Sequence, residues 1–317
     1  MSESPPVAAK GLVKRYGEVV AVDHVDLDVE AGDVFGYLGP NGAGKTTSLR
    51  MLLGLIRPSE GSVRLFGRDP LLAGAKALDG VAGFVEGPCF YPYLSGRKNL
   101  QLLADYDDNG ARGRVEEVLE LVELRNRAKD RVGGYSHGMR QRLGIAASLL
   151  RAPRLLLLDE PTTGLDPAGM RDMRALVKRL AGEGITVLLS SHLLSEVEEL
   201  CNRVAIIRSG RIVYQGSLAE LMSTAHSGYR MRASEPERAR ALCLGQDGID
   251  DVELSDGTLH FSADEDAVAA LSIALGEAGI GITSLVPEVA SLEELFLGLT
   301  EGDDLPPVPS ALAEAAA

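Results

Sequence analysis

Short, uninterrupted aliphatic runs recur through the first two thirds of the chain and predict strands that are buried on both faces. Four ranges have this character: Val34–Leu38, Gly80–Val85, Leu155–Leu158 and Ile185–Leu189. The runs Val25–Val29 and Ser62–Phe66 instead alternate apolar and polar residues, which predicts an antiparallel addition to the parallel sheet.

Apolar residues at spacings of three and four predict helices between these strands. One helix is expected after Ser136, and another from Pro167, a residue suited to a first helical turn, to about Leu180. Strands that alternate with helices predict an α/β fold.

A second pattern begins near Ser227. Strands are expected at Tyr229–Ala233, Val252–Leu254, Thr258–Ser262 and Gly281–Val286, and helices at Glu235–Leu244, Asp264–Ala278 and Ser291–Leu299. Asp256-Gly257 is a typical hairpin turn, and the order βαββαβ predicts a small α+β domain of the ferredoxin-like kind. We therefore expect a flexible N-terminus (1–6), an α/β domain (7–225), a C-terminal α+β domain (226–300) and a disordered acidic, Ala-rich tail (301–317).

The composition narrows the function classes. The 317 residues carry a formal net charge of −14, which disfavours nonspecific binding to nucleic acid or to an anionic bilayer. Three widely spaced cysteines form no visible disulfide framework or metal cluster, as expected in a reducing cytosol. The longest stretch without a charged residue, Gly184–Ser195, has 12 residues, whereas a spanning helix needs about 20. Any role at a membrane is therefore expected to require a separate partner.

The strongest motif is a phosphate-binding loop after the strand Val34–Leu38. It consists of Gly39, Pro40, Asn41, Gly42, Ala43, Gly44, Lys45 and Thr46, with Thr47 following. Glycines allow successive backbone N–H groups to face phosphate oxygens, and the helix N-terminus adds positive partial charge. Lys45 would reach the β- and γ-phosphates, and the Thr46 hydroxyl would complete a Mg²⁺ shell.

Two carboxylates end the strand Leu155–Leu158. Asp159 suits a water-mediated contact to Mg²⁺, and Glu160 is placed to take a proton from an attacking water. Such a strand end can simply face solvent, but its position downstream of a phosphate loop favours the functional interpretation.

From about Val7 to Met222, the chain resembles the ATP-binding subunits of ABC transporters. The resemblance rests on motifs in the family's order: Lys14-Arg15-Tyr16-Gly17, the phosphate loop, Phe84-Val85-Glu86, Tyr135–Arg142, Asp159-Glu160-Pro161, Gly164-Leu165-Asp166 and Ser191-His192. It implies a P-loop NTPase fold of the ABC type, with an antiparallel β subdomain and a helical subdomain, that hydrolyses ATP.

The resemblance also implies roles for individual residues. Tyr16 would stack on adenine, although by position alone it could be an ordinary rim tyrosine. Ser136 and Gly138 match the signature sequence, which contacts the γ-phosphate bound by the other protomer. His192 would contact the γ-phosphate and hold Glu160 and the water in line, and Asp166 would act across the dimer interface.

Two departures from the family pattern stand out. Glu86, an expected Mg²⁺ ligand, replaces the usual glutamine, and the signature reads Ser136-His137-Gly138-Met139 where Ser-Gly-Gly-Gln is commonest. His137 and Met139 are larger than the residues they replace. Because Ser136, Gly138 and Glu160 are retained, hydrolysis is expected to survive.

One phosphate loop and one signature imply a dimer, in which each protomer's loop faces the other's signature. A homodimer bound to a polytopic membrane permease, at the cytoplasmic face of the cell membrane, is the expected assembly. A soluble ABC-type ATPase acting on nucleic acid or the ribosome is a remote alternative, because no second ATPase domain, coiled-coil insertion or basic patch is present. A binding module without catalysis would need Lys45 or Glu160 to be missing.

Local features resemble the bacitracin- and daunorubicin-type drug exporter ATPases. They are Glu86–Gly96 with its aromatic-proline pair, Tyr135–Leu143, and Ala290–Leu297. Phe90, Tyr91 and Tyr93 would suit a docking groove for the permease if they are exposed, and core packing is the alternative. An antibiotic or other hydrophobic drug is the preferred cargo, and lipid, polysaccharide or peptide export stays open.

Overall fold

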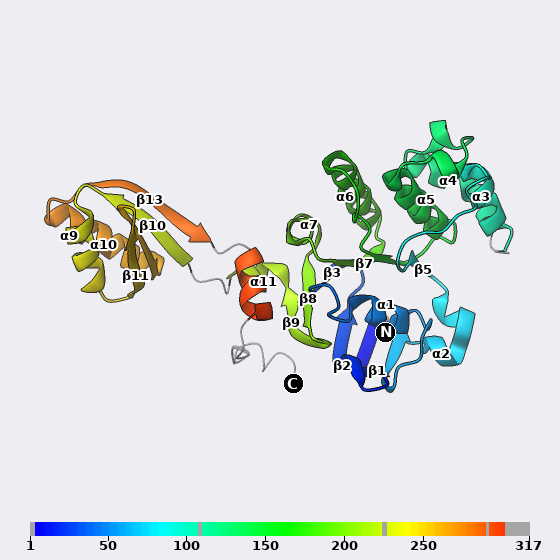
Figure 1. Ribbon diagram of the computed structural model, residues 1–317, viewed down its shortest axis with the longest axis horizontal. Helices are drawn as coiled ribbons and strands as arrows, with labels where there is room; N and C mark the ends of the chain where they lie inside the picture. The colour runs from blue at the N-terminus through cyan, green and yellow to red at the C-terminus, as the bar shows by residue number, and fades with distance from the viewer. Residues whose placement is uncertain (1–3, 107–109, 224–226, 290–291, 302–317) are drawn as a thin grey trace. The chain divides into compact units, whose positions relative to one another are not determined.

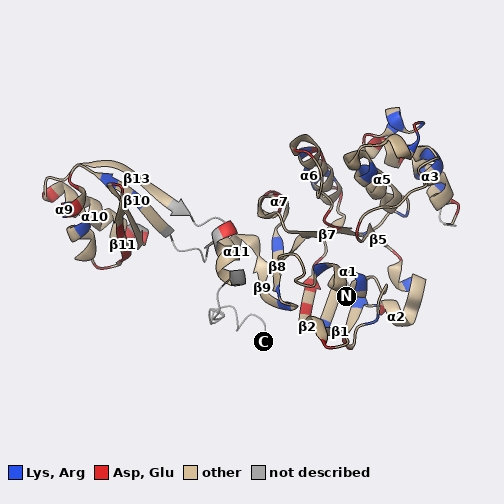
Figure 2. Cartoon of the chain, in the orientation of Figure 1, with Lys and Arg blue, Asp and Glu red and all other residues tan. Residues whose placement is uncertain are grey.

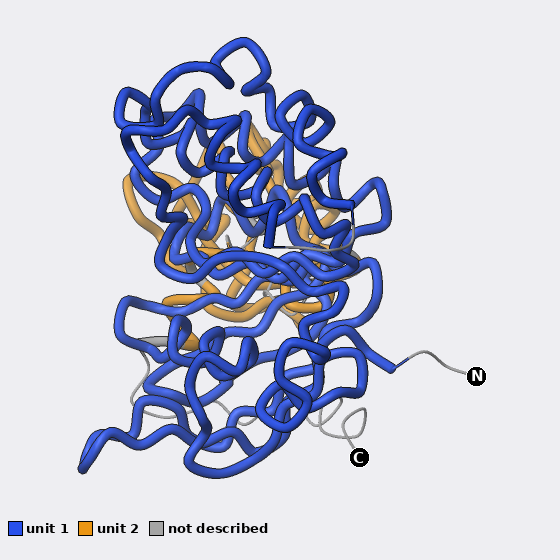
Figure 3. Tube along the Cα trace, turned by 90° about the vertical axis from the view of Figure 1, so that its right-hand side faces the viewer, with its two compact units in different colours: residues 1–218 blue, residues 219–317 orange. Residues whose placement is uncertain are grey.

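The computed structural model describes residues 4–106, 110–223, 227–289 and 292–301. The chain divides into two compact units, 1–218 and 219–317 (Figure 3). No helix among the described residues has the length and apolar character that crossing a membrane requires. The predicted tail beyond residue 301 and residues 1–3 of the predicted N-terminal segment lie outside the described residues.

A six-stranded sheet forms the centre of the first unit, in the order β5-β6-β7-β3-β8-β9. Its strands are β3 (Val34–Leu38), β5 (Val81–Phe84), β6 (Leu155–Asp159), β7 (Thr186–Ser191), β8 (Arg203–Arg208) and β9 (Arg211–Ser217). All neighbours are parallel except β8 and β9. Every residue of β6 and β7 is buried, which is why these strands read as continuous aliphatic runs. The four predicted buried strands are confirmed; β8 and β9 were not predicted.

The alternating runs do not extend the parallel sheet, although their pattern predicted that they would; they form the antiparallel β subdomain that the family resemblance implied. They belong to β2 (Val19–Val29) and β4 (Glu60–Leu65), which pair with β1 (Val7–Tyr16) in a separate three-stranded antiparallel sheet. The antiparallel addition to the parallel sheet is β9 instead. The helix α1 (Lys45–Leu52) lies between the two sheets (Figure 1), and its Leu49 and Leu52 share one buried cluster with residues of both. The inward residues of β2 therefore pack across α1 rather than pair with β3.

The remaining helices of the first unit connect these strands. They are α2 (Pro70–Ala73), α3 (Gly96–Ala104), α4 (Val115–Leu121), α5 (His137–Leu149), α6 (Pro167–Gly182) and α7 (Leu194–Leu200), with 3₁₀ turns at Gly74–Leu78, Ala111–Arg114, Arg125–Arg127 and Val132–Gly134. Both predicted helices are confirmed as α5 and α6. Ser136 and Asp166 are their N-caps: each side chain accepts a hydrogen bond from a backbone N–H in the first turn.

The second unit contains a four-stranded antiparallel sheet in the order β11-β12-β10-β13. The elements here are α8 (Leu218–Ser223), β10 (Ser227–Ala233), α9 (Pro236–Leu244), β11 (Ile249–Ser255), β12 (Thr258–Ala263), α10 (Glu265–Glu277), β13 (Ile282–Val289) and α11 (Leu292–Glu301). Asp256 and Gly257 have φ values of 50° and 73°, which is the backbone of a tight two-residue hairpin turn. Residues of α9 and α10 share a buried cluster with Met231, Leu259 and Phe261 of the sheet.

Candidate functional site

The phosphate loop connects the end of β3 to α1. Gly42 and Gly44 have φ values of 82° and 107°, a backbone that favours glycine. A Cβ on Gly39 would lie 2.4 Å from the Ile207 carbonyl oxygen, and one on Gly44 would lie 2.5 Å from the Ala21 carbonyl oxygen. The loop is thus held between the backbones of β8 and β2. Its outer residues Pro40, Asn41 and Gly42 are exposed, and Thr47 is half-buried on the helix behind.

Lys45 folds back over the loop that precedes it. The side chain is only 5% exposed, and Nζ donates to the carbonyl oxygens of Gly39 at 2.7 Å and Pro40 at 3.2 Å. Nζ also lies 3.5 Å from Oε1 of Glu160. The ammonium group is therefore already fixed beside the loop, in a position to meet an anion there.

Asp159, at the end of β6, collects three donors. Thr46 Oγ1 donates to Oδ2 at 3.1 Å, Ser190 Oγ donates to Oδ1 at 2.5 Å, and the Glu86 backbone N–H donates to Oδ2 at 3.2 Å. A hydroxyl and a carboxylate side by side are hard oxygen ligands of the kind Mg²⁺ takes, with phosphates and waters completing its shell. These residues fit the predicted metal. Ser190 belongs to none of the sequence motifs, and its role at Asp159 is visible only in the structure.

Glu160 follows directly, in a left-handed conformation with φ 46°. Its Oε2 accepts from Thr163 Oγ1 at 2.9 Å and lies 3.2 Å from His192 Nδ1. Burial by itself raises the pKa of Glu160, but the Thr163 hydrogen bond and the charges of His192 and Lys45 outweigh it, so the pKa lies below the ordinary value of 4.5. The carboxylate is therefore ionised at neutral pH, as a proton acceptor must be.

The segment that carries His192 is anchored by a buried carboxyl group. Ser191 Oγ accepts from the Leu193 backbone N–H at 2.9 Å and donates to Glu196 Oε2 at 3.0 Å. Glu196 is 1% exposed. Glu196 and Thr163 lie outside the sequence motifs, so their contacts with Ser191 and Glu160 are visible only in the structure.

Glu86 lies just beyond β5 with φ 68°. Its carboxylate forms an ion pair with Arg50 of α1, a residue the sequence analysis missed, and its side chain is 64% exposed. Glu86 also lines a cavity of about 300 Å³, together with Thr46, His137, Gln141, Asp159, Glu160 and Thr163. The structure thus places it beside the expected metal ligands but with a competing partner.

The signature residues stand at helix N-termini. Ser136 accepts from the Met139 backbone N–H at 3.2 Å, and Asp166 accepts from the Gly169 backbone N–H at 2.9 Å. A Cβ on Gly138 would lie 3.4 Å from Leu165 Cδ2. The side-chain hydrogen bonds of Ser136 and Asp166 are therefore local caps, separate from the cluster around Glu160.

Tyr16 ends β1 and is 48% exposed. Lys14 Nζ lies 5.1 Å from the centroid of its ring. The tyrosine is not part of the core, so its ring is accessible to a flat ligand.

Comparison with known proteins agrees with this geometry. The ABC transporter family profile matches residues 22–163. The chain is 39% identical to the bacitracin transport ATP-binding protein BcrA of Bacillus licheniformis, over 92% of this chain and 96% of that protein. It is 37% identical to the daunorubicin resistance ATP-binding protein DrrA3 of Streptomyces coeruleorubidus, over 94% of this chain and 96% of that protein.

The fold has close neighbours among solved structures. A dimeric post-hydrolysis state of the ATP-binding cassette MJ0796, bound to ADP and phosphate, matches with a TM-score of 0.60 and 26% identity, over 67% of this chain and 98% of that one. Taken with the loop, the paired carboxylates and near full-length similarity to named relatives, this match leads to one assignment. The chain belongs to the family of ABC transporter ATP-binding proteins.

Proposed function

We propose that this chain is the ATP-hydrolysing subunit of a membrane exporter whose cargo is an antibiotic or another hydrophobic drug. The observation that carries the proposal is the carboxylate of Glu160, held by Thr163 and His192 beside the phosphate loop. The cargo class rests on the relatives named for bacitracin transport and daunorubicin resistance. Export of lipid, polysaccharide or peptide is the alternative.

The proposed chemistry follows from the geometry of the site. The backbone N–H groups of 41–46 bind the phosphates of ATP, Lys45 pairs with the β- and γ-phosphates, and Tyr16 stacks on adenine. Thr46 and Asp159 would hold Mg²⁺, and the bound metal would supply positive charge that stabilises the phosphate oxygens.

Hydrolysis then needs a base. Glu160 takes the proton of a water while the water oxygen bonds to the γ-phosphorus and the bond to the bridging oxygen breaks, which leaves ADP and phosphate. His192, 3.2 Å from the Glu160 carboxylate, keeps that carboxylate in line with the water.

A second copy completes each site in this proposal. Ser136 and Gly138 begin α5, whose N-terminus is a suitable partner for an anion, and they would meet the γ-phosphate held by the other protomer. Asp166 would act across the same interface. The dimeric state described for the neighbour MJ0796 supports this arrangement.

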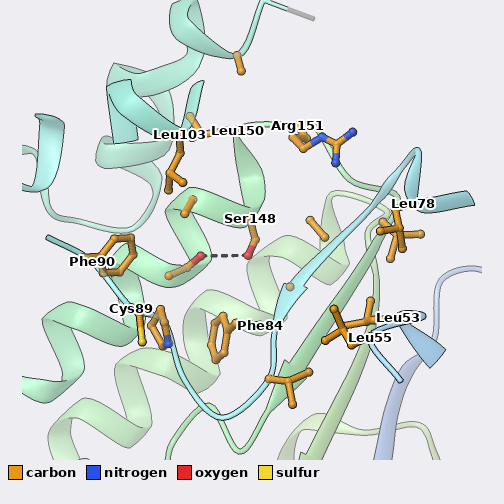
Figure 4. Close-up of a pocket in the computed structure, with 18 residues that line it drawn as sticks. Leu53, Leu55, Leu78, Phe84, Cys89, Phe90, Leu103, Ser148, Leu150 and Arg151 are labelled. Atoms are coloured by element: carbon orange, nitrogen blue, oxygen red, sulfur yellow. Dashed lines mark hydrogen bonds between the residues drawn. The ribbon is translucent and has the colours of Figure 1, made fainter. Parts of the chain in front are cut away.

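An apolar groove on the first unit suits a helix of the permease. Two adjoining hollows of about 460 and 560 Å³ share Cys89, Phe90 and Leu103. Figure 4 shows Phe84, Phe90 and Leu103 directed into the first, opposite Leu53 and Leu78. Apolar residues on both walls are the surface that the apolar face of an amphipathic helix requires.

The backbone of the aromatic segment beside this groove is anchored by a buried side chain. Buried Asn99 of α3 accepts from the Tyr91 backbone N–H at 2.9 Å and donates to the Tyr91 carbonyl oxygen at 3.1 Å. The rings of Tyr91 and Tyr93 are 55% and 64% exposed, with centroids 5.8 Å apart. They are available to a partner at little further cost in conformational entropy.

We expect Tyr91→Ala combined with Tyr93→Ala to weaken attachment to the permease. Truncating two aromatic anchors in an interface typically costs binding more than tenfold. The chain expressed alone should stay in the supernatant, the wild type co-expressed with its permease should sediment with membranes, and the double variant should shift to the supernatant. ATP affinity should be unchanged, because neither tyrosine belongs to the nucleotide cluster.

Leu72→Ala is the matched control for this experiment. Leu72 is 84% exposed on α2 and lines neither hollow. Its loss should leave sedimentation unchanged. Wild-type protein that remained in the supernatant beside its permease would contradict the transporter role itself.

Glu86 is expected to tune the demand for Mg²⁺. A carboxylate binds Mg²⁺ more strongly than an amide oxygen but also repels the γ-phosphate. Glu86→Gln should therefore retain activity and need more Mg²⁺ for half-maximal turnover, whereas Glu86→Ala should lose more activity. Titrating ATPase activity with Mg²⁺ in the wild type, Glu86→Gln and Glu86→Ala measures this requirement. Superimposable curves would show that Glu86 has no part in Mg²⁺ binding and only forms its ion pair with Arg50.

Charge on the helices gives no support to a nucleic-acid ATPase. Residues of both signs share the surface of α3–α6 (Figure 2), where Arg97 pairs with Glu116 and Arg142 with Glu123. A nucleic-acid site requires a cluster of positively charged residues.

The cargo class can be tested by the drug tolerance of cells that express the chain with its permease. If these cells tolerate more drug than cells without the pair, and Glu160→Gln abolishes the gain, the cargo is a drug. If expression of the pair leaves drug tolerance unchanged, export of lipid, polysaccharide or peptide is favoured.

A further inference from the structure

His137 departs from the family signature, and the structure shows where its side chain goes. The imidazole Nε2 lies 2.9 Å from the Thr163 carbonyl oxygen of the same chain. The ring also rests on Gly164, where an added Cβ would lie 3.4 Å from its Cδ2 atom. The side chain thus turns from the start of α5 toward the segment that follows Glu160.

Thr163 connects this imidazole to the proposed general base. While its carbonyl oxygen meets His137, its hydroxyl donates to Glu160 Oε2 at 2.9 Å. One residue therefore carries both contacts, and displacement of its backbone alters the hydrogen bond to the carboxylate. Glu160 itself has a positive φ, a backbone conformation that surrounding contacts must hold in place.

The chemistry of these groups fixes the direction of the bond. A carbonyl oxygen only accepts, so His137 Nε2 carries the proton. Gln141, one helical turn later, is 4% exposed; in the structure its amide nitrogen Nε2 lies 3.5 Å from the same imidazole nitrogen, while its Oε1 has no partner among the described residues. The two amide positions are nearly interchangeable in shape, and the orientation with oxygen toward the ring gives the imidazole N–H a second acceptor.

We propose that His137 is a positioning residue for Glu160 of its own chain. It connects the signature loop, which in the proposed dimer meets the partner's nucleotide, to the base that acts on the chain's own nucleotide. This inference rests on the proposed function and adds a route of communication between the two sites of the dimer. It differs from a role for His137 at the partner's γ-phosphate, because the effect stays within one chain.

Homodimers provide the first test. His137→Ala should lower kcat about five- to tenfold, the typical effect of one hydrogen bond, with KM for ATP unchanged. His137→Gln presents an N–H group at similar reach and should restore most of kcat. Equal kcat for His137→Ala and wild type, or an Ala defect that Gln does not relieve, would overturn the inference. Thermal melting separates these effects from misfolding.

Mixed dimers of two differently tagged full-length chains give the sharper test. With Glu160→Gln on one chain, only the other chain's base works. His137→Ala on the chain that keeps Glu160 should again lower kcat about five- to tenfold. His137→Ala on the chain that carries Glu160→Gln should leave kcat unchanged. The opposite pattern would show that His137 acts on the partner's nucleotide and would overturn the inference.

Different results would contradict the proposed ATPase function and the proposed role of His137. Absence of ATP hydrolysis or of an ATP-dependent dimer in the wild type would contradict the proposed function. If the dimer with a single Glu160→Gln does not turn over, the homodimer comparison of Ala with Gln still decides the role of His137.

Discussion

Replacing Glu160 by glutamine is expected to lower ATP turnover by about 10²–10⁴, the usual contribution of a positioned general base. Glutamine keeps the size of the side chain and can still contact Thr163 and His192, but it cannot accept the proton of the attacking water. ATP binding should persist, because Lys45 and Thr46 are unchanged. The variant should therefore accumulate as a dimer in Mg-ATP, and size-exclusion chromatography with steady-state ATPase assays measures both effects.

Glu237→Gln is a suitable control for this experiment. Glu237 is exposed on α9 of the second unit, so the same chemical change should leave turnover and dimer formation as in the wild type. A Glu160→Gln protein that stayed monomeric and hydrolysed ATP at the normal rate would refute the assignment of the base.

Replacing Lys45 by alanine is expected to weaken the binding of ATP. Loss of a charged hydrogen-bond donor to phosphate typically weakens affinity by about 10- to 100-fold. The Lys45 side chain is 5% exposed, and its ammonium group is fixed by two carbonyl oxygens of the loop. The dissociation constant for ATP should rise by that factor, and titration calorimetry measures it directly.

Lys98→Ala provides the comparison, since Lys98 is exposed on α3 and distant in sequence from the loop. Its affinity for ATP should equal that of the wild type. Unchanged affinity in Lys45→Ala would mean that the loop amides alone hold the phosphates. Together with Glu160→Gln, the pair of variants separates binding from hydrolysis.

The sequence predicted those parts of the structure that depend on residues close together along the chain. The four buried strands, α5 and α6 could be predicted because burial on both faces or on one helical stripe leaves a contiguous record in residue type. The phosphate loop could be predicted for the same reason: its glycines are adjacent, and the φ values of Gly42 and Gly44 follow from a constraint within the loop.

Contacts between segments that are far apart in the sequence could not be predicted, because no local pattern of residue types marks them. The sequence does not encode locally which strands share a sheet, and so β2 and β4 were assigned to the parallel sheet although they pack across α1. The partners of the site residues are equally remote: Arg50 meets Glu86 across 36 positions, and Ser190 meets Asp159 across 31.

His137 illustrates the division. The sequence showed that His137 is larger than the residue usual in the family, but it did not indicate which group its imidazole would bond to. The sequence by itself determined the phosphate loop, the four buried strands and the helices α5 and α6, because those depend on neighbours along the chain. Only the tertiary structure decided that the imidazole meets the Thr163 carbonyl 26 positions away, because that distance depends on how α5 packs beside the end of β6.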